Sequence, residues 1–157
     1  MSDQKKLAII ATKGSLDWAY PPFILASTAA ALGYETQIFF TFYGLQLLRK
    51  KLHLEVTPLG NPGMPMPMGM DKWFPVLGTA LPGMQSMMTA MMKKKMKDKG
   101  VASIEELREL CQEAEVKLIA CQMTVDLFDM NPAEFIDGVE YAGAAAFFEF
   151  AGESDIC

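Results

Sequence analysis

Apolar residues along this chain alternate between short continuous runs and longer stretches with helical spacing. A continuous apolar run covers residues 7–12, and residues 35–41 and 116–120 are two further strand candidates. A continuous run of this length is typical of a strand buried on both faces of a parallel sheet. Helical patterns follow or separate these segments at residues 17–32, 42–51, 83–99, 103–111, 124–130, 131–136 and 143–151. Residues 53–57 and 138–142 are predicted as two further short strands. The alternation predicts an α/β fold with a mostly parallel sheet.

The first helical stretch is apolar enough to raise the question of a membrane span. It contains Asp17, Ser27, Thr28 and the Pro21-Pro22 pair, and it falls short of the roughly 20 clean apolar residues that a span requires. We therefore expect a buried helix, with Ser15 or Asp17 as its N-cap and the prolines in its first turn, where a missing N–H costs least.

The regular pattern lapses over residues 61–82, which are rich in proline, glycine and methionine. The following helix repeats methionine at helical spacing and ends in a lysine cluster. We predict one domain over residues 1–157, with this loop and amphipathic helix inserted at about residues 61–99. The methionines suit a pliable contact surface between subunits or for a partner protein. A helix lying on a membrane surface and a Cu(I) site are the alternatives.

Composition narrows the functional classes. A net charge of −5 argues against nucleic-acid binding. With a single histidine and three cysteines that lack metal-finger spacing, the sequence predicts no metal site, and we expect no cofactor. The polar N-terminus does not resemble a secretory signal, so we expect a cytoplasmic location in which the cysteines are thiols. The residues after the first run lack the glycine spacing of a phosphate loop or a dinucleotide-binding turn.

Cys121 ends the buried run at residues 116–120, where the pattern changes to helix. A cysteine at such a junction faces unpaired backbone N–H groups, which can lower a thiol pKa from about 8.5 to about 3.5–7.5. Ligands and reactive groups gather at the carboxyl edge of parallel sheets. Cys121 is therefore either a nucleophile or an inert buried thiol. Its predicted surroundings at that edge are Gln122, Met123, Thr124, Lys13, Gly14 and Ser15, and Thr41 ends the second run at the same edge.

The sequence gives weaker evidence of a chemical role for the other two cysteines. Cys111 lies on the apolar side of a predicted helix, where packing is the simpler role, although it could resolve a persulfide if its Cα lay within about 7 Å of that of Cys121. Cys157 is the last residue, and it is either incidental or a second acceptor thiol for Cys121 of its own or a neighbouring subunit.

Several segments together resemble the DsrE/DsrF-like family over residues 6–151, in the branch that carries peroxiredoxin-like or membrane-associated names. The resemblance rests on LAIIATKGSLDWAYPPFILASTAAALGYETQIFFTFYGLQLLRK, the Met-Pro loop, VKLIACQMTVDLF and IDGVEYAG. Its most specific piece is a strand followed by Cys-x-Met-[Ser/Thr], which places the family's carrier cysteine on Cys121.

This resemblance implies a flavodoxin-like three-layer sandwich, a homo-oligomer, and a sulfur carrier or sulfurtransferase that holds sulfane sulfur as a persulfide on Cys121. It implies rhodanese-type or TusA-like partners in cytoplasmic sulfur trafficking. The alternative is a non-catalytic interaction or membrane-surface module, peripheral at the inner membrane face, that works through the Met-rich segment. A thiol peroxidase is disfavoured because Thr-x-x-Cys is missing at Cys121.

Overall fold

The computed structural model describes residues 4–58 and 81–157, which form two compact units. The first unit contains residues 4–14, 18–52 and 103–157. The second contains residues 15–17, 53–58 and 81–102. Most of the Met-Pro loop lies outside the described residues.

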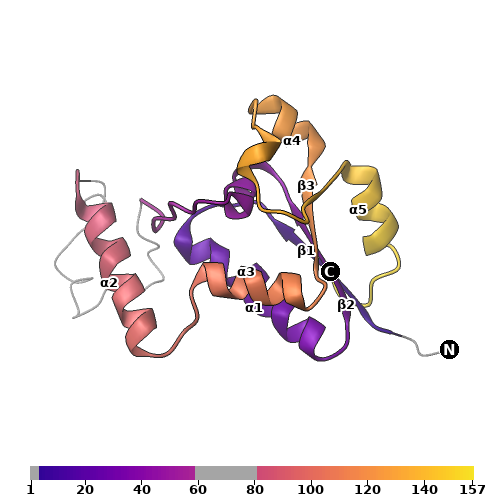
Figure 1. Ribbon diagram of the computed structural model, residues 1–157, viewed down its shortest axis with the longest axis horizontal. Helices are drawn as coiled ribbons and strands as arrows, with labels where there is room; N and C mark the ends of the chain where they lie inside the picture. Colours follow the sequence, from indigo (N-terminus) through magenta and orange to yellow (C-terminus); the bar gives the residue numbers. More distant parts are fainter. Residues whose placement is uncertain (1–3, 59–80) are drawn as a thin grey trace. The chain divides into compact units, whose positions relative to one another are not determined.

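A four-stranded parallel sheet forms the centre of the first unit (Figure 1). Its strands β1 (Lys6–Ala11), β2 (Glu35–Phe40), β3 (Lys117–Cys121) and β4 (Glu140–Ala142) lie side by side in chain order. The strands predicted at residues 7–12, 35–41 and 116–120 are present as β1, β2 and β3. The short strand predicted at residues 138–142 is β4. Because all the strands run the same way, their carboxyl ends meet at one edge.

Helices cover both faces of this sheet. On one face, α1 (Leu16–Ala31) packs Phe23 against Phe40 of β2, with ring centroids 5.9 Å apart, and α3 (Ile104–Glu113) contacts α1. On the other face, α5 (Ala144–Ala151) packs Phe147 against Phe39, with centroids 5.3 Å apart. Successive strand residues point to opposite faces, so β2 serves both layers. The predicted α/β class is confirmed.

The remaining helices are short or belong to the second unit. They are η1 (Phe42–Leu48) and η4 (Pro132–Glu134), which are 3-10 helices, and α2 (Met84–Asp98) and α4 (Gln122–Leu127). A capping box is present at the start of α3, since Ser103 and Glu106 each accept a hydrogen bond from the other's backbone N–H.

The positions of Pro21 and Pro22 differ from the prediction. Because α1 begins at Leu16, both prolines lie beyond its first turn, inside the helix. Each removes one backbone hydrogen bond. The helix nevertheless continues because Ala19, Phe23 and Ala26 bury one face completely, and this packing outweighs the local preference.

The short strand predicted at residues 53–57 is also wrong. This segment is not a strand; its backbone groups are bonded within the second unit by side chains instead of by a neighbouring strand. The Val56 N–H donates to Thr89 Oγ1 at 3.0 Å, and the Val56 carbonyl accepts from Gln85 Nε2 at 2.9 Å. Both partners come from α2, whose proximity the sequence pattern does not reveal.

Candidate functional site

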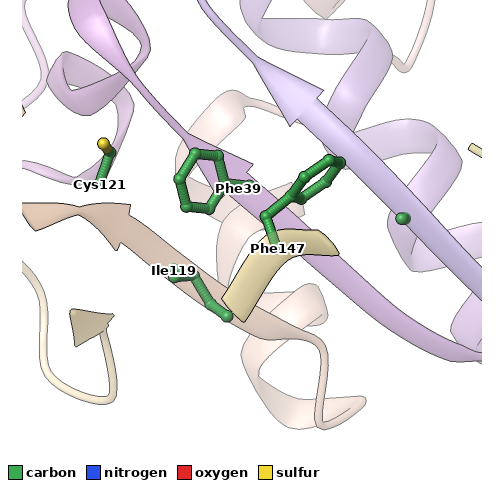
Figure 2. Packing of buried hydrophobic residues seen from close by; sticks show 5 residues of the cluster. Phe39, Ile119, Cys121 and Phe147 are labelled. Carbon is green, nitrogen blue, oxygen red and sulfur yellow. The ribbon is translucent and has the colours of Figure 1, made fainter. Parts of the chain in front are cut away.

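Cys121 is the last residue of β3 and the N-cap of α4. Its side chain lies on the α5 face, in a cluster with Phe39, Ile119 and Phe147 (Figure 2). Only 4% of the residue is exposed, yet Gln122 and Met123, which follow directly, are exposed. In Figure 2 the sulfur lies to one side of the phenyl rings, at the end of the strand. The thiol is therefore just beneath the surface rather than deep in the core.

Neutral hydrogen-bond donors favour the anionic form of this sulfur. Burial by itself raises the pKa of the Cys121 thiol, but the hydroxyl and N–H of Thr124, the hydroxyl of Thr41 and the N–H of Met123 together bring the pKa below its ordinary value. By distance and angle, the Cys121 side chain makes no full capping hydrogen bond. The Met123 and Thr124 N–H groups nevertheless occupy the N2 and N3 positions that an N-cap acceptor faces.

Two threonine hydroxyls form the polar wall of the site. Thr124 is fully buried, and its Oγ1 lies 3.1 Å from Thr41 Oγ1, which comes from the end of β2. The N–H of Phe42 also donates to Thr124 Oγ1, at 3.4 Å. The contact between Thr41 and Thr124 joins residues 83 positions apart in the sequence. Thr124 is one of the residues predicted to surround Cys121. For Thr41 the sequence predicts only a position at the same edge of the sheet and no role.

The turn after β2 is held in an unusual backbone conformation. Phe42 has a φ of 48°, which is uncommon for an aromatic residue. Its ring packs edge-on against Phe128 at 6.1 Å, and Tyr43 stacks on the same ring at 5.9 Å. Gly44 fits because a Cβ there would overlap the carbonyl oxygen of Ala11. The end of β1 and this aromatic cluster thus fix the backbone that carries Thr41.

Cys111 is placed on the other side of the sheet from Cys121. It is fully buried in α3, where its thiol donates to the Phe23 carbonyl oxygen at 3.6 Å. Phe23 packs on Phe40, and Phe40 points to the face opposite Phe39 and Cys121. A sheet therefore separates the two sulfurs, and the arrangement offers no direct path for Cys111 to resolve a persulfide within this chain.

Burial raises the pKa of the Cys111 thiol to about 11. We therefore expect the stability of the fold to depend on pH in the alkaline range. The folded-state pKa lies above the unfolded value. The protonated Cys111 thiol therefore contributes its full stability to the fold below the unfolded pKa, and this stability is lost as pH rises through about 9 to 11. We expect the wild type to lose about 2–3 kcal/mol more than Cys111→Ala over this range. Urea unfolding at a series of pH values measures the difference. Parallel pH profiles for the two proteins would contradict it.

Cys157 is exposed and lies at the far edge of the sheet from β3. The preceding residue, Ile156, forms a parallel bridge with Leu7 of β1, beyond which lie β2 and then β3. Three strand spacings amount to about 14 Å. A disulfide requires Cα atoms within about 7 Å. Cys157 therefore does not reach Cys121 of the same chain in this fold.

The loop after β1 supplies less to the thiol than its position suggests. The Lys13 ammonium sits 3.6 Å from the centroid of the Trp18 ring, and Gly14 packs against the carbonyl oxygen of Tyr43. Ser15 belongs to the second unit, where its hydroxyl lies 3.2 Å from Thr57 Oγ1. Within the described part of the chain, no charged group contributes to the lowered pKa of Cys121. Neutral dipoles act there instead.

Two further observations bear on the class of protein. Over residues 4–58 and 81–157, no group of three or more histidine, cysteine or acidic side chains is arranged to hold a metal ion. None of the helices in the same ranges is both long and apolar enough to cross a bilayer.

The fold is thus a parallel α/β sheet with a thiol of lowered pKa at the carboxyl end of an inner strand. The chain belongs to the DsrE/DsrF/DrsH-like family, whose model matches residues 3–157. It is 92% identical over 155 residues to the sulfur carrier protein DsrE2 of Allochromatium vinosum, covering 99% of this chain and 98% of that protein. It is 36% identical over 163 residues to YrkE of Bacillus subtilis, again covering 99% and 98% of the two chains.

Among solved structures, the chain resembles the ychN protein of E. coli. The TM-score is 0.53, and the match covers 98% of this chain and 96% of that one, at 12% sequence identity. At this identity the likeness concerns the fold alone. It supports the α/β architecture described above.

Proposed function

We propose that this protein is a sulfur carrier in which Cys121 holds sulfane sulfur as a persulfide. The observation that carries the assignment to Cys121 is the set of four neutral donors around its sulfur, which favour the anion at a strand end. The 92% identity to a sulfur carrier protein over nearly the whole of both chains supports the carrier role. Cys111 has the opposite environment, in which burial keeps the thiol protonated.

The transfer proposed here exchanges one sulfur–sulfur bond for another. The Cys121 thiolate attacks the outer sulfur of a donor persulfide, a new S–S bond forms at Cys121, and the donor's S–S bond breaks. The donor leaves as a thiolate with the bonding electron pair, so no external oxidant or reductant is needed. Delivery is the reverse step, in which an acceptor thiolate attacks the outer sulfur and Cys121 leaves as the stabilised anion.

The proposal extends to partners and location. A carrier needs a donor and an acceptor with an accessible cysteine, and we propose rhodanese-type or TusA-like proteins in the cytoplasm for these roles. Exposed apolar residues close to Cys121 in the chain or in space offer a contact area: Phe42, Tyr43, Met123, Leu127 and Phe128. We also keep the homo-oligomer as a prediction. The comparisons lend no support to the alternative of a membrane-surface module.

Loading with a low-molecular-weight persulfide tests the function directly. We expect the reduced protein to gain about 32 Da, the mass of one sulfur atom, on the peptide that contains Cys121. Dithiothreitol should reverse the gain. This reversal distinguishes a persulfide from a sulfinic acid of nearly equal mass, which dithiothreitol does not reduce. An adduct confined to Cys111 or Cys157, or no adduct at all, would contradict the assignment.

A further inference from the structure

We propose that the hydroxyl of Thr41 is the hydrogen-bond donor to the outer, transferred sulfur of the Cys121 persulfide, while Thr124 and the α4 backbone hold the inner sulfur. This inference rests on the proposed carrier function and assigns a separate task to a residue of the neighbouring strand. It predicts that removing this hydroxyl lowers the equilibrium level of sulfur loading.

The sheet register places Thr41 beside Cys121. Phe40 pairs with Ala120 in the parallel ladder between β2 and β3, so the next positions along are Thr41 and Cys121. Thr41 is still extended, with φ −137° and ψ 159°, and its N–H bonds the Ala11 carbonyl at 3.0 Å. Alternation along the strand therefore points Thr41 to the same face as Phe39, which is the face of Cys121.

Counting donors and acceptors separates the roles of the two hydroxyls. Thr124 is fully buried, and its oxygen has two acceptor sites and one proton. Either hydroxyl can be the donor in the contact between Thr41 and Thr124. When Thr41 donates, its hydroxyl and the Phe42 N–H fill both acceptor sites of Thr124, and the Thr124 proton is left for the Cys121 sulfur. Thr41 is only partly buried, and its proton can turn from Thr124 to sulfur at Cys121.

A persulfide supplies that acceptor. Its outer sulfur lies about 2 Å beyond the inner one and carries the negative charge. The groups on α4 are adjacent to the inner sulfur in the chain, whereas Thr41 approaches from the neighbouring strand. A hydrogen bond to the outer sulfur stabilises that charge. Thr41 thus favours the loaded form of Cys121 over the free thiolate.

The test compares the equilibrium of sulfur loading in wild type, Thr41→Val and Thr41→Ser. Each protein is equilibrated with a fixed ratio of cysteine persulfide to cysteine, and the loaded fraction is measured by mass spectrometry. The pH is held well above the Cys121 thiol pKa, so that a change in that pKa does not alter the thiolate fraction. In Thr41→Val we expect the loading equilibrium constant to fall by about tenfold, because the loaded form loses a charge-assisted hydrogen bond. Thr41→Ser should restore loading.

A matched variant on the other hydroxyl provides the contrast. Thr124→Val removes the donor to the inner sulfur, which carries the charge in the free thiolate, so it should raise the Cys121 thiol pKa without lowering the loading equilibrium constant. A loading equilibrium that is unchanged in Thr41→Val, or lowered equally in Thr124→Val, would overturn the role of Thr41 while leaving the carrier function intact. Failure of the wild type to load would overturn the carrier function itself, and this proposal with it.

Discussion

Cys121→Ser is expected to lose sulfur loading completely while keeping the fold and gaining slightly in stability. Oxygen in place of sulfur removes the atom that forms the S–S bond, so no residual uptake at this position is possible. The same position is the N-cap of α4, where the Cys121 sulfur is only a weak acceptor and makes no full capping hydrogen bond. Serine is among the preferred N-cap residues, and its oxygen can accept from the N–H of Met123 or Thr124, a gain of about 0.5–1 kcal/mol.

Intact-protein mass spectrometry after persulfide treatment, together with thermal unfolding, measures both parts of this prediction. Cys111→Ala and Cys157→Ser are the controls, and both should retain the adduct of about 32 Da. Loading that persists in Cys121→Ser would refute the carrier cysteine. A large drop in melting temperature would instead show that the sulfur is needed for packing in the cluster with Phe39 and Phe147.

Gly44→Ala is expected to have the largest effect on stability and also to damage the site at a distance from the sulfur. The added methyl group would overlap the Ala11 carbonyl oxygen, which is backbone and cannot rotate away. Moving the turn away from the end of β1 should lower the free energy of unfolding by about 3 kcal/mol. Because Gly44 also donates its N–H to the Thr41 carbonyl at 3.0 Å, the displacement should move the Thr41 hydroxyl away from Cys121. The pKa of the Cys121 thiol should then rise.

Urea unfolding and the pH dependence of Cys121 alkylation check the two consequences. The midpoint of alkylation should shift to higher pH in Gly44→Ala. Gly143→Ala is the control, because a Cβ there meets no atom within 4 Å. Its cost should stay below about 1 kcal/mol, as expected for the N-cap of a short helix, and its alkylation profile should match the wild type. Unchanged stability in Gly44→Ala would contradict the close approach of the two segments.

The sequence by itself determined the α/β class, the three main strands and the position of Cys121 at a strand-to-helix junction. These features are local: a continuous apolar run predicts a buried strand, and a change of period predicts where the strand ends. The capping box at Ser103, formed within a Ser-x-x-Glu pattern, is equally local. The family was also recognisable from the residues around Cys121, and the family model confirmed it.

The surroundings of the thiol were decided by the tertiary structure. The β2–β3 pairing brings Thr41 to Thr124, and no periodicity in the chain states which strands are neighbours. The same holds for Cys111, whose separation from Cys121 depends on which face of the sheet α3 covers. A pKa responds to donors and burial within a few ångströms, whatever their distance along the chain. The reactivity of Cys121 is therefore a property of the assembled sheet edge, whereas its location is a property of the sequence.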